Sequence, residues 1–332
     1  MIEKSNKNIV VIGGGTGIFS VLTGLKKYFK NITAIITMAD DGGSSGILRE
    51  DFGVLPPGDV RRALIALSNT DNKLLNELFN YRFNEGRGLK GHSFGNLILL
   101  ALERITKDFE KAIEAAGKIL NIQGKIIPVT LDNIKLYAEL ENGEIIKGER
   151  NIDIPKHLPY IPIKKVWLEP KCKINPRARK AILEADYIII GPGDLYSSII
   201  PNILVKGAKE AIKRSKAKVI YIVNIMTKFG ETNKFKASDF FFTLEKYLGK
   251  KVVDYLIVNK EKPSEKRLKP YKKENADFVI PDIEKIPKYV KIISGDLIRK
   301  KGLLRHDPEK IAKLIYNLVE TRGGGVVKRT RL

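Results

Sequence analysis

The sequence predicts an α/β fold: a doubly wound, mostly parallel, Rossmann-like sheet with a small β insertion subdomain. Two glycine-rich stretches, residues 13–17 and 39–46, lie about one strand–helix–strand unit apart, and each follows an apolar run. Apolar runs then alternate with amphipathic stretches along most of the chain, as in a parallel sheet covered by helices on both faces. We therefore expect one domain spanning residues 1–332, with its ligand at the carboxyl edge of the sheet.

The first glycine-rich stretch, GGGTG, separates the apolar run 9–12 from an amphipathic helix. Backbone amides at a helix N-terminus bind phosphate, and glycine lets a ligand approach the backbone closely. The stretch does not complete the G-x-G-x-x-G dinucleotide fingerprint, and no Lys-Ser or Lys-Thr follows it as in a P-loop. The predicted ligand-binding residues here are Gly14, Gly15, Gly17 and Thr16, whose hydroxyl adds a donor.

The second unit is a strand at 32–38 followed by the loop ADDGGSSG at 39–46. Because parallel strands end at the same edge of a sheet, this loop and GGGTG are expected to face one crevice. Its predicted ligand-binding residues are Asp40, Asp41, Gly42, Ser44 and Ser45.

Another acidic residue, Asp59, stands at the start of a helix predicted from residue 58. Two loops that end at one crevice bring carboxylates together, and Mg²⁺ prefers carboxylate oxygens. Asp41 and Asp59 are therefore the predicted metal ligands, and Mg²⁺ is the candidate cofactor. The alternative is structural: Asp59 caps its own helix, and Asp40 or Asp41 pairs with Arg49 or Arg61.

The middle of the chain is predicted to hold a helix from about residue 93 and a β-rich insertion at about 124–170. Strands are expected at 125–129, 134–140 and 144–147, with Glu141-Asn142-Gly143 as a hairpin turn between the last two, and the insertion continues to residues 166–170. His92 and Asn96 flank the start of the helix and are candidate ligand contacts. For His92 the alternative is a hydrogen-bonded turn residue.

The second half resumes the α/β alternation. Strands are expected at 187–190, 218–224 and 255–258, and helices at 176–184, 237–248 and 308–319, the last capped by Asp307. The loop after the strand 187–190 presents Gly193 and Tyr196, and Asn224 and Thr227 follow the next strand as directional hydrogen-bonding groups. Residues 323–332 are expected to form a frayed basic tail.

Composition narrows the function class. The 332 residues include 60 Lys and Arg against 38 Asp and Glu, a formal charge of +22. The lysines are spread along the chain rather than gathered in a nucleic-acid module, so nucleic acid is an unlikely partner and an anionic nucleotide is favoured. No apolar run reaches membrane-spanning length, and we expect a cytoplasmic protein. The single cysteine, Cys172, excludes an internal disulfide and a thiolate metal cluster.

Several motifs together resemble the gluconeogenesis factor family (YvcK or GlmR proteins), within the wider group that includes the 2-phospho-L-lactate transferases (CofD). They occur in order over nearly the whole chain: GGGTG at 13–17, ADDGGSSGILRE at 39–50, LPPGDVRRAL at 55–64, GHSFGNL at 91–97, GPGDLYSSIIPNIL at 191–204, NIMTKFGETNKFKASD at 224–239 and RHDPEKIA at 305–312. The resemblance implies a protein that binds UDP-N-acetylglucosamine or a related UDP-sugar and adjusts carbon flow into cell-wall precursors, and hence cell shape.

The resemblance also implies residue roles and partners. Arg305 resembles the family arginine associated with the nucleotide sugar, and glucosamine-6-phosphate synthase is a candidate partner; a homo-oligomer is compatible with the family. A regulator without turnover is favoured, because no Ser-His-Asp set or activated cysteine is visible. The alternative is a Mg²⁺-dependent transferase like the phospholactate transferases. The chain departs from the family pattern at Asp194, where serine is common, and at Lys228 and Phe229, where glutamine and proline are common.

Overall fold

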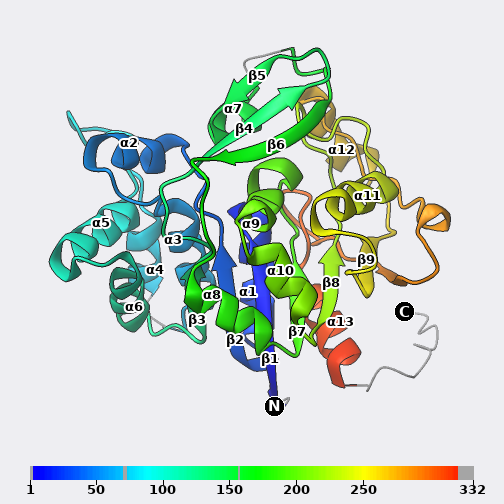
Figure 1. The fold of residues 1–332 in the computed structure, drawn as a ribbon, viewed down its shortest axis with the longest axis horizontal. Helices are drawn as coiled ribbons and strands as arrows, with labels where there is room; N and C mark the ends of the chain where they lie inside the picture. The colour runs from blue at the N-terminus through cyan, green and yellow to red at the C-terminus, as the bar shows by residue number, and fades with distance from the viewer. Residues whose placement is uncertain (1–2, 70–72, 156–157, 321–332) are drawn as a thin grey trace.

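The computed structural model describes residues 3–69, 73–155 and 158–320 and contains the predicted parallel sheet. Seven strands run in the order β10-β9-β8-β7-β1-β2-β3, and every neighbouring pair is parallel. Their bounds are β1 Ser5–Gly13, β2 Phe29–Ile36, β3 Lys125–Pro128, β7 Tyr187–Ile190, β8 Lys218–Ile222, β9 Tyr255–Asn259 and β10 Lys291–Gly295. The Rossmann-like α/β fold class is confirmed (Figure 1).

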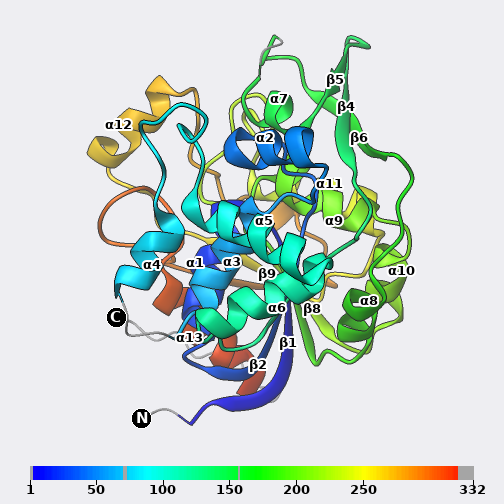
Figure 2. The same ribbon diagram turned by 90° about the vertical axis from the view of Figure 1, so that its left-hand side faces the viewer.

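Helices cover both faces of this sheet, which is why its central strands are apolar throughout rather than alternating. On one face α1 (Gly15–Leu25) packs against α3 (Gly58–Leu67) and α13 (Pro308–Glu320), with α5 (Phe94–Thr106) and α6 (Phe109–Ile119) packed alongside α3. The other face carries α8 (Pro176–Leu183), α9 (Ile200–Leu204), α10 (Ala208–Arg214) and α11 (Ala237–Leu248). Figure 2 shows the two helical layers on opposite sides of the strands.

The predicted β insertion forms a separate antiparallel sheet of order β5-β4-β6, made of β4 Lys135–Leu140, β5 Ile145–Lys147 and β6 Ile163–Glu169. With the short helix α7 (Glu149–Asp153), it lies beyond the end at which the parallel strands finish (Figures 1 and 2). The first strand assigned to the insertion is an exception. Lys125–Pro128 pairs with β2 instead and forms the edge of the main sheet.

Several segments form regular elements that were not predicted: strand β10, helices α6 and α10, α2 Gly43–Phe52, α4 Lys73–Asn80, the π-helical turn Leu195–Ile199, α12 Glu265–Lys273 and the short 3₁₀ turn Ile283–Lys285. The basic tail predicted at 323–332 lies outside the described residues. Of the helices in the described part of the chain, none is both long and apolar enough to cross a membrane.

The two predicted helix caps have different outcomes. Asp307 caps α13 as predicted, because its Oδ1 accepts hydrogen bonds from the backbone amides of Glu309 and Lys310. The prediction that Asp59 caps α3 is wrong: the N-cap position is Pro57, and Asp59 lies within the first turn. Its carboxylate is therefore available to another partner.

The close packing of α1 on α13 predicts that a methyl group added at Gly24 destabilises the fold. A Cβ at Gly24 would lie 2.0 Å from the Pro308 carbonyl oxygen, so Gly24→Ala must push the two helices apart. We expect a loss of about 1–3 kcal/mol in the free energy of unfolding, measured by urea denaturation. Gly295→Ala is the control, because a Cβ there meets nothing closer than 4.0 Å. Equal stabilities of the two variants would contradict this packing.

Candidate functional site

The candidate site lies where the chain changes direction across the sheet. From β1 the chain proceeds to β2 and β3 on one side and to β7 through β10 on the other, so the loops after β1 and β7 diverge at the carboxyl edge. Open α/β sheets bind ligands at this point. A cavity of about 160 Å³ lies there, lined by Gly15, Thr16, Gly17, Ser20, Pro192, Gly193, Asp194, Asn224, Ile225, Met226, Thr227, Leu304, Arg305 and His306.

The first wall of the cavity is the N-terminus of α1, as predicted for GGGTG. Gly14 is the N-cap residue and offers no side-chain cap, and the first turn presents the exposed Thr16. Gly17 has a packing reason to be glycine: a Cβ there would lie 2.2 Å from the Pro192 carbonyl oxygen. The loops after β1 and β7 therefore touch backbone to backbone.

Asp59 lies directly behind this wall. A Cβ at Gly14 would lie 2.5 Å from Asp59 Oδ2, and the carboxylate accepts a hydrogen bond from the backbone amide of Gly15. Burial, together with Asp40, raises the pKa of Asp59 to about 6, although Arg62 contacts its Oδ1 at 3.2 Å. Asp59 thus caps α1, and the predicted phosphate-binding helix already holds one carboxylate at its first amide.

The loop after β2 does not line the cavity. Asp40 Oδ1 accepts a hydrogen bond from the amide of Gly42 at 3.0 Å, and Asp41 Oδ1 accepts one from the amide of Arg150 at 2.7 Å. Ser45 Oγ accepts from the amide of Gly58. The predicted metal ligands Asp41 and Asp59 therefore have different partners. Asp41 binds the helix α7 beside the small sheet, and the acidic neighbour of Asp59 is Asp40 instead.

The structural alternative proposed that Asp40 or Asp41 pairs with Arg49 or Arg61. Neither arginine forms an ion pair with the carboxylate of Asp40 or Asp41, so that pairing is wrong. Arg49 donates to the Asp40 carbonyl oxygen at 2.9 Å. Arg61 donates to Asn96 Oδ1 and to the carbonyl oxygen of Phe79.

Three other predicted contacts form a buried network instead of a cavity wall. Ser44 Oγ lies 3.2 Å from His92 Nδ1, and it accepts from Asn96 Nδ2 at 3.1 Å and from the amide of Ser93 at 3.3 Å. Because both lone pairs of this hydroxyl are occupied, its proton is directed at His92 Nδ1. The network joins α2 to α5, in agreement with the structural alternative for His92.

The loops after β7 and β8 supply the second wall. Asn224 Oδ1 accepts a hydrogen bond from the amide of Gly193 at 3.1 Å, so this side chain holds the loop that lines the cavity. Thr227 Oγ1 accepts from the amide of Asp277 at 2.8 Å. Tyr196, predicted to contact ligand, is 95% buried in the core, and its amide donates to Glu231 Oε2.

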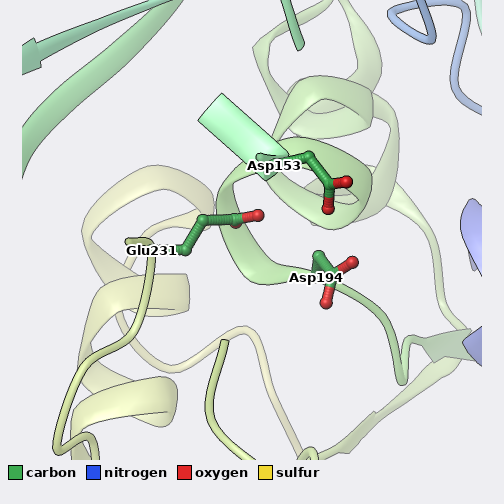
Figure 3. Close-up of side chains that lie close together, drawn as sticks. All are labelled: Asp153, Asp194 and Glu231. Atoms are coloured by element: carbon green, nitrogen blue, oxygen red, sulfur yellow. The ribbon is translucent and has the colours of Figure 1, made fainter. Parts of the chain in front are cut away.

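An acidic cluster that sequence reasoning missed lies beside the cavity. Carboxylate oxygens of Asp153, Asp194 and Glu231 lie within 4.8 Å of one another (Figure 3). Burial and then Asp194 raise the pKa of Glu231 to about 8, and burial also raises the pKa of Asp194. Lys228 Nζ lies 2.7 Å from Asp153 Oδ1 and supplies a positive charge inside the cluster. The departures at Asp194 and Lys228 were the available signal, because the two opposite charges interact electrostatically here.

The donor set of this cluster fits a resident Mg²⁺ only in part. Carboxylate oxygens suit the ion. However, Glu231 already accepts from the Ser197 hydroxyl and from two backbone amides, and Asp153 is paired with Lys228. A divalent ion would have to displace Lys228, so we assign no metal to these residues.

Arg305 and His306 complete the cavity from a segment far along the chain. Burial lowers the pKa of Arg305, as do Arg299 and Arg62, and its guanidinium remains charged. His306 is almost fully buried, and burial lowers its pKa to about 4. The cavity therefore presents amide, hydroxyl and guanidinium donors together with one neutral imidazole.

Comparison with known proteins identifies the family of this chain. A model of the family described as 2-phospho-L-lactate transferase CofD matches residues 9–298. The chain belongs to this family. It is 47% identical over 319 residues to a putative gluconeogenesis factor of Clostridium acetobutylicum, covering 94% of this chain and 69% of that protein. It is 42% identical over 316 residues to the gluconeogenesis factor of Bacillus subtilis, covering 94% and 98%.

Among solved structures, this CofD-family chain is similar to the crystal structure of protein BH3568 from Bacillus halodurans. The TM-score is 0.89 at 44% sequence identity, and the match covers 94% of this chain and 99% of that one. The fold is thus shared with this relative over nearly the full length of both chains.

The buried His306 of this CofD-family chain predicts a pH dependence of stability. Its pKa is about 4 in the folded state and near 6.5 when unfolded, so its contribution is complete above pH 6.5 and is lost as the pH falls toward 4. Between pH 7.5 and 5.0 the native protein should lose about 2 kcal/mol more than His306→Asn, which has no titrating ring. Urea unfolding at both pH values measures this difference, and parallel losses would show that the imidazole is not buried neutral.

Proposed function

We propose that this chain binds a UDP-sugar, with UDP-N-acetylglucosamine as the first candidate, in the cavity between the loops after β1 and β7. We further propose that it acts without turnover, as a cytoplasmic regulator of carbon flow into cell-wall precursors and cell shape. Relatives that carry the name gluconeogenesis factor at 42–47% identity support this role. Glucosamine-6-phosphate synthase is the proposed partner protein.

The observation that carries the proposal is the set of donors at the cavity. The first turn of α1 and the Thr16 hydroxyl face Arg305 across a space of about 160 Å³ at the switch in strand order. Helix N-termini favour anions, and a guanidinium grips phosphate oxygens through two N–H groups. The cavity is smaller than the usual 300–1,000 Å³ of a small-molecule site, so it suits the diphosphate, with the rest of the ligand extending along the edge of the sheet.

Negative charge around the cavity sets a condition on this binding. Asp59 and Asp194 lie close to the proposed diphosphate position and repel it unless cations intervene. Arg62 contacts Asp59, and Lys228 offsets Asp194 electrostatically. These two residues make the site neutral enough for an anion, and Mg²⁺ would strengthen binding through the same charges.

A second candidate function is a Mg²⁺-dependent transferase reaction on a diphosphate-linked group. The family description favours it, as does the carboxylate of Asp59 behind the α1 wall, with Asp40 as its acidic neighbour. In that case a metal held near Asp59 would neutralise the diphosphate, and Asp59→Asn should abolish turnover while the protein stays folded.

Calorimetric titration with UDP-N-acetylglucosamine, with Mg²⁺ and with EDTA, separates the two functions when the recovered ligand is then analysed by chromatography. Micromolar binding of a ligand recovered intact supports the regulator. Metal-dependent binding with conversion of the ligand supports the transferase. Absence of binding under both conditions would refute the proposed UDP-sugar ligand.

Replacing Arg305 tests how much its guanidinium contributes to the binding free energy of the proposed ligand. Arg305→Gln should weaken UDP-N-acetylglucosamine binding about 10- to 100-fold, since a hydrogen bond to a charged group contributes about 1.5–3 kcal/mol. Lys301→Gln is the matched control, because it removes the same charge from an exposed position in the neighbouring segment. Equal affinities of the two variants, measured by calorimetry, would exclude Arg305 from the site.

A further inference from the structure

His306 is a lining residue of the cavity, and one of its ring nitrogens has no hydrogen-bond partner in the protein. The residue is 96% buried, and its backbone is held on both sides, by an antiparallel bridge to Ile298 and by the start of α13. Its Nε2 is covered from solvent and has no hydrogen-bond partner. The ring is thus fixed in place while one of its polar atoms is unsatisfied.

The hydrogen bond of the other nitrogen determines the tautomer. The ring bonds to the backbone of Val223, whose own amide already donates to the Ile257 carbonyl oxygen. The available group at Val223 is therefore its carbonyl oxygen, and Nδ1–H of His306 donates to it. Because the imidazole is neutral, Nε2 carries a lone pair and no proton.

An unsatisfied acceptor of this kind is uncommon, because native proteins pair nearly all their buried polar groups. Within the described part of the chain, three other buried side-chain atoms lack a partner: Asn76 Oδ1, Asn202 Oδ1 and Tyr221 OH. None of those residues lines the cavity, whereas His306 does. Of these four atoms, His306 Nε2 is therefore the one that belongs to a residue of the cavity wall.

We propose that His306 Nε2 accepts a hydrogen bond from an N–H or O–H group of the bound UDP-sugar and thereby selects for it. This inference rests on the proposed function of the cavity and assigns a second kind of recognition to it. The α1 amides, Thr16 and Arg305 all donate and so recognise phosphate oxygens. An acceptor beside them adds discrimination, because a ligand that lacks the donor leaves Nε2 unsatisfied.

Two substitutions separate this role from a structural one. In His306→Asn the amide occupies the place of Nδ1 and keeps the bond to Val223, but no acceptor reaches the Nε2 position. In His306→Gln the amide oxygen reaches the Nε2 position and the bond to Val223 is lost. We expect His306→Asn to bind UDP-N-acetylglucosamine about tenfold more weakly than wild type, and His306→Gln to bind within about threefold of it while being the less stable variant.

If His306 has only a structural role, the order of the two binding affinities is reversed. Unimpaired binding by His306→Asn, with weak binding by His306→Gln, would overturn the proposal and show that the Val223 bond is what matters. If His306→Asn does not fold, His306→Gln and His306→Met give the same contrast, since both lose the Val223 bond and only glutamine keeps an acceptor. Equal affinity of that pair also overturns it, because Nε2 is then satisfied by a trapped water or by nothing.

The source of the donor follows from titrating the same variants with UDP. An equal loss with UDP and UDP-N-acetylglucosamine places the donor on the nucleoside, where the uracil imide N–H is the candidate. A loss confined to the sugar nucleotide places it on the sugar. Wild-type protein that binds neither compound refutes the UDP-sugar function and this inference together, whereas wild-type binding with unaffected variants refutes only the inference.

Discussion

The site depends on a close approach of two backbones. Gly17 at the start of α1 meets the Pro192 carbonyl in the loop after β7, and a single methyl group would separate them. The two loops diverge from neighbouring strands, so this contact closes the base of the cavity and brings Asn224, Arg305 and His306 near the α1 N-terminus. On the other side of the same turn, the absence of a side chain at Gly14 admits Asp59 to within capping distance of Gly15.

Charge at the carboxyl edge is balanced locally rather than by the strongly basic chain as a whole. Carboxylates from separate elements gather there, and Glu149 shows the result: burial and then Asp40 raise its pKa to about 10, so it stays protonated at neutral pH. Arg62 at Asp59 and Lys228 at Asp153 provide the opposing charges. The proposed anionic ligand would therefore enter a site in which carboxylates and cations are already paired, and its binding would have to redistribute those pairs.

The small sheet is attached to the site through the same residues. Asp41 accepts from the Arg150 amide, Asp153 pairs with Lys228, and Tyr160 packs edge-on against Phe229. Lys228 and Phe229 are two of the positions at which the sequence departs from its family pattern. Both residues contact the insertion, so they join it to the loop after β8. A movement of the small sheet would therefore displace the loop after β8, which forms part of the cavity wall.

The sequence by itself determined most of the regular elements and the edge of the sheet at which the glycine-rich loops lie. Periodicity and glycine placement are local signals, so the strands other than β10, most of the helices that cover them and the glycine-rich start of α1 could be predicted from short windows. Tertiary structure decided which loops meet. β1 pairs with both β2 and β7, but the cavity forms among the segments after β1, β7 and β8. Asp41 and Ser44, after β2, bond instead to the Arg150 amide and to the His92 network, so they are structural contacts. The role of Asp59 as a cap for α1, the electrostatic interaction of Asp194 with Lys228, and the unpartnered nitrogen of His306 all depend on contacts between residues distant in sequence, which no local pattern specifies.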